Sequence, residues 1–410
     1  MADVTPTPLT LDLLGRLVGG DAVAIRGAAT LEPAGGSGDK VFPPTHSVDA
    51  RANTRYAFEQ RRIDGREVTC VLLDSVQSQA NRMEDALQAL WTAGRIALPV
   101  IEVDFSAVAP DVGIVTSLSA PHRIADALLR DSMIGGILFR FSDIGRSFSD
   151  ATPKNAAPLF RVCPTGLVFG LWDSTGPKGG LGSKFARALV SELIGVNAVA
   201  GSKTASRLDP TGIVTKASDV LVAADPKEHW THDPALAKQK EGKPVKLGDG
   251  KVSEVNHSNI PPSIDTLAGG VTIDHALHTV VLSLAALRKL GFDTGESEAR
   301  TVLAALGLLA VLAAESRGHD LRSRCLLVPR KGQSLRLEAV HRDGTTESMN
   351  LDLEGAIALF NAAAATLPDS LRFSKKPGEP LATLTPSPKL AHLVKRSREL
   401  AAVGSDVDVK

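Results

Sequence analysis

The chain has 410 residues, of which 43% are hydrophobic and 22% charged, and its formal net charge is zero at pH 7. This composition is typical of a globular protein with a substantial core, and it argues against a protein that coats nucleic acid through bulk positive charge. The three cysteines, Cys70, Cys163 and Cys325, lie far apart and form no CxxC pair, which argues against a zinc knuckle or a disulfide framework.

No targeting or membrane segment is expected. The N-terminal stretch MADVTPTPLTLDLL carries acidic residues where a secretory signal needs a basic flank. The longest apolar run, Val302–Ala314, has 13 residues, which is short of the roughly 18 that a membrane span needs. We therefore expect a soluble, cytoplasmic protein.

Along the first half of the chain, strands and helices are predicted in turn. A buried strand is expected at Glu67–Leu73, and Asp74 has the short carboxylate of a helix N-cap. Residues 75–91 then predict a helix, because apolar residues recur there at helical spacing. A strand at Arg95–Phe105, a helix in PHRIADALLRDS and a buried strand at Pro164–Trp172 follow.

The second half begins with an irregular segment. Residues 225–262 are rich in lysine, glycine and proline and lack a long apolar period, so we expect a flexible insertion and a candidate thumb-like element there. Beyond it, helices are predicted at Asp274–Leu290, Ser297–Arg317 and EGAIALFNAAAA, and strands in RSRCLLVPR and SLRLEAVHRDGTTESMNL, where Asp343-Gly344 marks a hairpin turn. Residues 367–410 form a polar tail. The elements interleave without strict alternation, so we predict an α+β fold in one domain spanning residues 1–410.

The segment DSTGPKGGLGSKFARALVSELIG leads a glycine-rich loop into what its pattern predicts to be a helix. It fails the nucleotide P-loop pattern because Ser183 precedes Lys184, and the dinucleotide pattern because Phe185 replaces the third glycine. Glycines still let the main chain approach an anion, and a helix start offers unpaired amides. Lys184 and Arg187 would lie on the polar side of this helix, and Lys178 adds a charge in the loop. A plain connection followed by an ordinary amphipathic helix is the alternative.

The polar face of the 75–91 helix is rich in amides and hydroxyls, whereas most solvated helices use glutamate and lysine. Its residues are Gln77, Ser78, Asn81, Arg82, Asp85 and Gln88. Such groups can hydrogen-bond a sugar–phosphate backbone or a neighbouring subunit. A merely soluble helix face is the alternative.

Two long segments, LLDSVQSQANRMEDAL and LVFGLWDSTGPKGGLGSKFARALVSELIGVNA, closely resemble the backbone subunit of type I-G (formerly I-U) CRISPR interference complexes, the Cas-seven-like group of the RAMP superfamily. PTHSVDARANTRYAFE and NAAPLFRVCPTGLVFG fit the same family. The resemblance covers most of Thr45–Asn197 and is looser beyond it. It implies a modified RNA-recognition-motif (RRM), ferredoxin-like core with large insertions, and several copies stacked along one CRISPR guide RNA as a helical filament.

In this superfamily a glycine-rich loop that leads into a helix contacts the backbone of the guide RNA. Carried onto this sequence, the resemblance assigns that role to Gly179, Gly180, Gly182, Ser183, Lys184 and Arg187. With the polar groups described above, the candidate RNA-binding set also includes Lys178, Gln77, Ser78, Asn81 and Arg82. A subunit that must accept any spacer is expected to bind phosphate and ribose and to leave the base edges to pairing.

The implied function is a non-catalytic RNA-binding backbone subunit of a type I CRISPR surveillance (Cascade) complex in antiviral defence. Its expected partners are the guide RNA, target DNA in the assembled complex, further copies of itself, and the other type I-G subunits, namely the large subunit and the fused five/six-type subunit. No cofactor is expected. A stand-alone enzyme that binds a phosphate-bearing substrate at the Gly176–Ser183 loop is the alternative.

Two residue classes are candidates for other chemistry. No motif selects a nuclease residue among Asp74, Asp143 and Asp173. His275 and His278 are expected three apart on a helix, and His229 and His232 lie in HWTH, but neither pair supplies enough ligands for a metal ion. We therefore expect no metal site, with histidines that face solvent or form hydrogen bonds.

Overall fold

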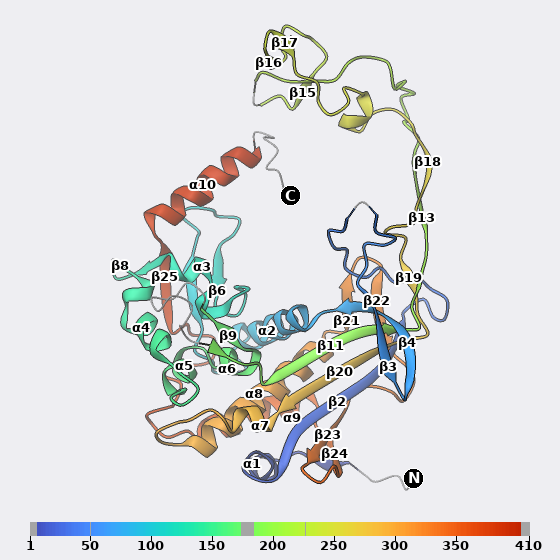
Figure 1. The fold of residues 1–410 in the computed structure, drawn as a ribbon. Helices are drawn as coiled ribbons and strands as arrows, with labels where there is room; N and C mark the ends of the chain where they lie inside the picture. The colour runs from blue at the N-terminus through green and yellow to red at the C-terminus, as the bar shows by residue number, and fades with distance from the viewer. Residues whose placement is uncertain (1–5, 50, 174–183, 226, 403–410) are drawn as a thin grey trace. The chain divides into compact units, whose positions relative to one another are not determined.

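A computed structural model describes residues 6–49, 51–173, 184–225 and 227–402 (Figure 1). Two compact units can be distinguished by their internal contacts. The first comprises Met1–His46, Tyr56–Val199 and Val271–Leu390, and the second Ser47–Arg55, Ala200–Gly270 and Ala391–Lys410. Helices and strands are mixed throughout, which confirms the α+β class.

A ten-stranded sheet organises the first unit. Its main path runs β1-β24-β23-β2-β20-β11-β4-β3, and the β21–β22 hairpin joins it at β2. In chain order the strands are β1 Thr7–Pro8, β2 Ala22–Pro33, β3 Phe58–Ile63, β4 Arg66–Asp74, β11 Leu189–Val196, β20 His275–Ser283, β21 His319–Arg322, β22 Cys325–Pro329, β23 Arg336–His341 and β24 Thr346–Asn350. The central strands β23, β2, β20, β11 and β4 are all antiparallel to their neighbours.

Helices pack on one face of this sheet (Figure 1). They are α1 Leu11–Gly19, α2 Val76–Thr92, α8 Glu296–Ser316 and α9 Leu353–Ala365. Strand β20 directs Ala276, His278, Val280 and Leu282 toward this layer, and all four are buried. Helix α8 is long and apolar enough to cross a membrane, but 72% of its apolar window is buried inside the protein, as in a core helix.

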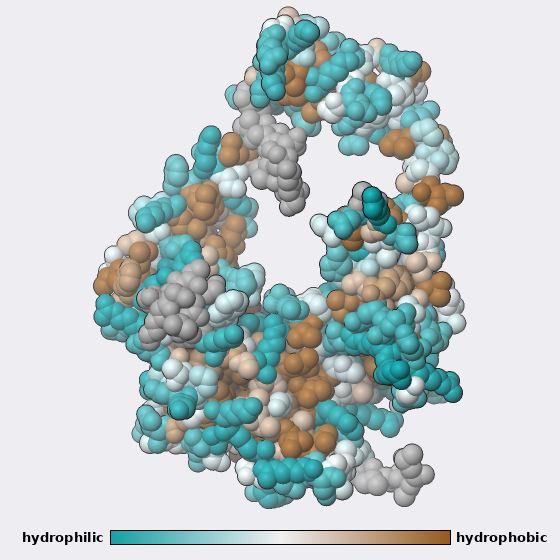
Figure 2. Space-filling view, in the orientation of Figure 1, coloured by the Kyte–Doolittle hydropathy of each residue, from teal (hydrophilic) through white to brown (hydrophobic). Residues whose placement is uncertain are grey.

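The opposite face of the sheet is accessible over β2, β20 and β11. Val190 and Val281 pair across β11 and β20 and are 40% and 42% exposed. Arg26 on β2 forms an ion pair with Glu338 on β23. Figure 2 shows the resulting mixture of hydrophobic and hydrophilic side chains on this face.

Short elements complete the first unit. A small sheet has the order β6-β5-β25-β7-β8, with β5 Ile101–Asp104, β6 Ile114–Thr116, β7 Ser132–Ile134, β8 Ile137–Leu138 and β25 Ala382–Pro386. The remaining elements are η1 Arg123–Ala125, α3 Ala127–Arg130, η2 Phe139–Phe141, α4 Asp143–Asp150, α5 Ala157–Val162, α6 Pro164–Phe169, β9 Leu171–Trp172, β10 Lys184–Phe185 and α7 Leu284–Leu287. Helix α10 Pro388–Ala402 begins at the end of the first unit, and its residues from Ala391 on belong to the second. The segment expected as a polar tail thus contributes β25 to a sheet.

The second unit contains a ribbon of two antiparallel strands, β13 Lys203–Arg207 and β18 Ile260–Asp265. Its other elements are β14 Leu221–Val222, β15 Trp230–Thr231, β16 Gln239–Lys240, β17 Lys243–Pro244 and η3 Val252–Val255, and β12 Val199–Ala200 and β19 Val271–Thr272 flank the unit in the chain. Segment 225–262 lies inside this unit. Its flexibility, and the organisation of the chain as one elaborated domain, stay predictions.

Several predicted elements are confirmed. Strand β4, helices α2, α8 and α9, and the β23–β24 hairpin occupy the expected segments. In the turn of that hairpin Gly344 has φ of 86°, a left-handed conformation that favours glycine.

Other predictions are wrong, and the reasons are tertiary. The helix expected after the glycine-rich loop is strands β10 and β11, and β11 is paired on both sides by β20 and β4. The helix expected at Asp274–Leu290 is mainly β20, where Thr279, Val280 and Val281 favour a strand. The strand expected at Pro164–Trp172 is mainly helix α6, with Pro164 in its first turn, since a short buried apolar run fits either structure.

Near α2 and α3 the boundaries also differ from the prediction. Ser75 is the N-cap of α2, its Oγ accepting from the Ser78 amide at 3.2 Å, so the expected cap at Asp74 is wrong by one residue. The helix expected in PHRIADALLRDS is reduced to η1 and one turn of α3, and the strand expected at Arg95–Phe105 to β5.

Candidate nucleic-acid interface

A groove with a volume of about 720 Å³ lies beside the N-terminal half of α2 in the first unit. Gln77 and Asn81 reach it from α2, and Lys184 and Arg187 from the segment that follows the glycine-rich loop. These four residues belong to the predicted RNA-binding set. The structure thus brings together residues about a hundred positions apart in the sequence.

Lys184 and Trp172 form one edge of the groove. They are paired residues of the β9–β10 ladder, and the Lys184 Nζ lies 5.5 Å from the centroid of the Trp172 ring. The indole is 59% exposed. A cation beside an exposed aromatic ring can hold a phosphate while the ring stacks on a base. Trp172 was not among the predicted site residues, although it stands directly before the loop.

Arg187 lies deeper and is half-buried. Its Nη1 donates to the Val76 carbonyl at the start of α2, at 3.2 Å. Burial lowers the pKa of Arg187, as does the charge of nearby Arg123, while Glu84 opposes the shift. The prediction that Arg187 lies on the exposed side of a helix is wrong, because it precedes a central strand and packs against the core.

Position 170 requires a glycine, because Arg187 packs directly against it. Its φ is 86°, and a Cβ at this position would lie 2.9 Å from the Arg187 Cγ and 3.3 Å from the Arg187 amide nitrogen. Any side chain would therefore strain the backbone and displace the arginine. The sequence offered no sign of this contact.

Beneath the groove, Arg123 and Glu84 form a buried ion pair. The guanidinium donates to both carboxylate oxygens at 2.6 and 2.7 Å, and the side chains are 7% and 1% exposed. Arg123 also donates to the Gly170 carbonyl at 3.2 Å and lies over the Phe169 ring. Burial raises the pKa of Glu84 to about 7, although Arg123 favours the charged form. This pair fixes the positions of α2 and of the chain around Gly170.

Among the described residues that line the groove, Lys184 and Arg187 supply positive charge to an incoming ligand. Arg123 is neutralised by Glu84, and Arg130, also in the lining, pairs with Asp131 at 2.6 Å. Neither Lys184 nor Arg187 forms an ion pair with a carboxylate of the described residues. Their charges are available to an anionic ligand.

The remaining predicted residues divide into two groups. Ser78 and Arg82 lie on α2 outside this groove, and the Arg82 Nε donates to buried Asp74 at 2.9 Å. Lys178, Gly179, Gly180, Gly182 and Ser183 lie outside the described residues. The ends of their loop, Asp173 and Lys184, both line the groove.

The three candidate nuclease aspartates have structural positions in the protein. Asp74 is fully buried and accepts from Gln79, Arg82 and Arg322 at 2.6, 2.9 and 3.0 Å. Asp173 is buried with Arg140 at 3.7 Å, and Asp143 begins α4.

The histidine pairs weighed as metal ligands are rearranged as well. His275 and His278 lie on strand β20 and not on a helix, so their odd spacing places them on opposite faces of the sheet. His278 instead meets Glu315 and His319, with potential ligand atoms that all lie within 4.8 Å of one another. His229 and His232 lie in the second unit.

Comparison with known proteins identifies one family. Residues 25–200, which include the whole groove lining from Gln77 to Arg187, match the family described as CRISPR-associated protein GSU0053. This region of the chain is therefore similar to a CRISPR-associated family, which supports the resemblance to a CRISPR complex subunit without specifying subtype I-G. No curated protein matches the chain.

Proposed function

We propose that this chain, a CRISPR-associated protein by its match over residues 25–200, is the non-catalytic RNA-binding backbone subunit of a cytoplasmic type I-G surveillance complex. The observation that carries the proposal is the groove. Residues from α2 converge there with Lys184, Arg187 and Trp172 at the two ends of the glycine-rich loop. That loop and helix face are the elements that a guide-binding role requires.

The topology of the large sheet supports an RRM-type, ferredoxin-like core. Strands β2, β11, β20 and β23 follow one another in the chain, and in space they lie in the order β23-β2-β20-β11. Helix α2 lies between β2 and β11 in the chain, and α8 between β20 and β23. Both helices cover the same face. This is a βαββαβ arrangement with a 4-1-3-2 strand order, interrupted by insertions.

The chemistry of the groove suits recognition of a nucleic-acid backbone. Lys184 and Arg187 offer charges to phosphates, and Gln77 and Asn81 offer amides that can hydrogen-bond phosphate or ribose oxygens. Trp172 offers a stacking surface that every base can use. None of these groups needs a particular base, so one subunit can accept any spacer and identical copies can follow one another along the guide.

The test is assembly of the full chain on guide RNA. We expect multimers whose size increases with guide length, an affinity that falls steeply with salt, and little change between spacer sequences of equal length. A protein that stays monomeric with guide RNA, or that prefers one spacer sequence strongly, would contradict the proposal. Tight binding of a small phosphate ester without RNA binding would favour the alternative enzyme.

A further inference from the structure

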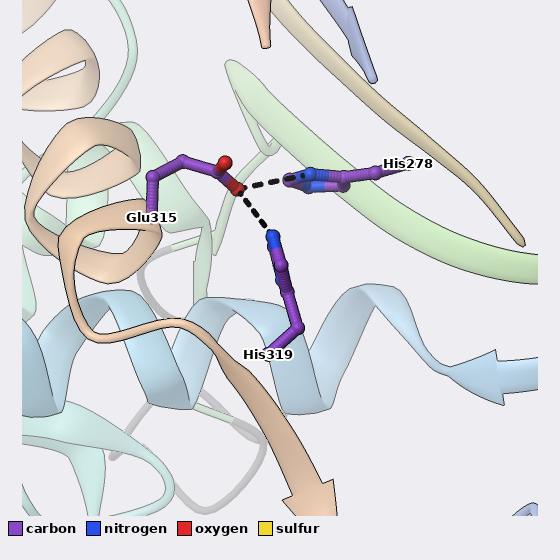
Figure 3. A group of neighbouring side chains, drawn as sticks. All are labelled: His278, Glu315 and His319. Atoms are coloured by element: carbon purple, nitrogen blue, oxygen red, sulfur yellow. Dashed lines mark ion pairs between the residues drawn. The ribbon is translucent and has the colours of Figure 1, made fainter. Parts of the chain in front are cut away.

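A second polar site lies in the first unit, on the far side of α2 from the groove. It consists of His278 on β20, Glu315 in the last turn of α8, and His319 at the start of β21 (Figure 3). The Glu315 Oε1 lies 3.0 Å from the His278 Nδ1 and 3.4 Å from the His319 Nε2. The three side chains are 3%, 17% and 8% exposed, and they line a cavity of about 220 Å³.

A chain of hydrogen bonds fixes which nitrogen of His278 carries a proton. Asp74 lies between Arg82 and Arg322 and can only accept, so the Gln79 amide nitrogen donates to it. The amide oxygen of Gln79 then accepts from the Ser191 hydroxyl at 2.9 Å. With that hydroxyl proton committed, the His278 Nε2 must donate to the Ser191 Oγ, 2.8 Å away.

The consequence is an unusual environment for the other nitrogen. The His278 Nδ1 is buried and makes no hydrogen bond with any described group, although Oε1 of Glu315 is only 3.0 Å away. In neutral His278 this nitrogen presents a lone pair, which therefore faces a carboxylate oxygen. Two acceptors at this distance need a positive charge between them, either a proton or a metal ion.

The position of His319 favours a metal ion. The His278 Nδ1 and the His319 Nε2 converge on the same carboxylate oxygen, and such a cluster of two nitrogen atoms and one oxygen atom can surround one ion. The rings lie at 74° to each other with centroids 5.4 Å apart. Ligand atoms about 2.0–2.1 Å from a tetrahedral Zn²⁺ lie roughly 3.3 Å from one another, close to the two short separations here.

Charge and surroundings agree with a cation. Asp85 and Asp320 line the same cavity, as do Arg82 and Arg317, so with Glu315 the carboxylates outnumber the guanidiniums. Ser191 holds the His278 ring through the nitrogen that would not bind the metal, as outer-shell partners of metal-bound histidines do. The cavity leaves room for a further ligand, such as water.

We propose that the His278 Nδ1, the Glu315 carboxylate and the His319 Nε2 bind one divalent transition-metal ion, with Zn²⁺ the best match. Two imidazoles and one carboxylate form a ligand set that such ions prefer. The ion would join β20, α8 and β21. This site is independent of the groove, so it can be tested without guide RNA.

The experiment uses the full chain, stripped with a chelator and titrated with Zn²⁺ by calorimetry. We expect one equivalent to bind and the melting temperature to rise with added metal. Glu315→Gln, which keeps the shape of the side chain, should weaken Zn²⁺ binding at least about 100-fold. His275→Gln, on the other face of the same strand, should leave binding unchanged. Co²⁺ added to the wild-type chain should give the visible absorption of a tetrahedral nitrogen–oxygen site, and this readout needs no variant.

Wild-type chain that binds no Zn²⁺ and gives no Co²⁺ spectrum would overturn the proposal, and the charge beside His278 would then be a proton. Binding that persists in the Glu315→Gln variant, or disappears in the His275→Gln variant, would also overturn it. If the wild-type chain binds no Zn²⁺ but assembles normally on guide RNA, the metal site is overturned and the proposed function stands.

Discussion

Removal of Arg123 should destabilise the first unit strongly. Arg123→Met deletes a guanidinium that is only 7% exposed and leaves the Glu84 carboxylate, 1% exposed, without its partner. It also removes the hydrogen bond to the Gly170 carbonyl. Breaking a buried ion pair from one side costs about 3–5 kcal/mol, which lowers the folding equilibrium constant by roughly two to four orders of magnitude.

Urea unfolding followed by circular dichroism measures this loss, at a pH above 7 where Glu84 is ionised in the wild type. The double variant Glu84→Met with Arg123→Met should recover most of it, because well-packed apolar residues often replace a buried pair without loss of stability. Arg95→Met is the matched control, since its pair with Glu354 is exposed and worth about 1 kcal/mol or less. The reasoning is refuted if Arg123→Met costs no more than Arg95→Met, or if the double variant is less stable than Arg123→Met.

Three further predictions concern backbone, pH and assembly. Gly170→Ala should lower the free energy of unfolding by at least about 1–2 kcal/mol and weaken RNA binding through Arg187. Gly15→Ala, with open space around it in α1, should raise the free energy of unfolding by about 0.5–1 kcal/mol. A urea midpoint that does not fall in Gly170→Ala, or that falls as far in Gly15→Ala, would contradict this. Because burial raises the pKa of Glu84 from 4.5 to about 7, the folded chain binds a proton that the unfolded chain has released, so stability should fall as pH rises through this interval. Glu84→Gln should flatten that slope, and an unchanged slope would show that Glu84 does not cause it. Limited proteolysis should cut first within 225–262, and guide RNA should protect that segment; equal cutting with and without RNA would remove its proposed role.

Elements that depend on local contacts could be predicted from the sequence, whereas elements decided by long-range strand pairing could not. Helix α2 was predictable because its apolar stripe and Ser75 cap lie within the segment itself. Strand β11 was not, because Leu189 and Leu193 fit both a helical and an alternating pattern. The segment is a strand because it pairs with β20, which begins about eighty residues later in the chain.

The residues of the candidate site also divide into those that local sequence predicts and those that depend on long-range contacts. Lys184 and Arg187 were selected because they follow a glycine-rich loop, and they do line a groove, although the helix expected to carry them is a strand region. Trp172 and Arg123 were missed because their roles depend on long-range contacts. The His278, Glu315 and His319 cluster was missed for the same reason: it forms only when β20 lies in the sheet beneath α8.

The central claim is that the groove binds guide RNA through its phosphates, and the salt dependence of RNA affinity in Lys184→Ala tests it most directly. Lys184 is exposed, so its removal should change stability by only about 0.5 kcal/mol or less. The exposed lysine Lys289, outside the groove lining, supplies the control Lys289→Ala. The account predicts that Lys184→Ala weakens guide binding and reduces the slope of log affinity against log salt by about one unit, while Lys289→Ala matches the wild type. If Lys184→Ala binds guide RNA with wild-type affinity and salt slope, the groove is not the guide-binding surface.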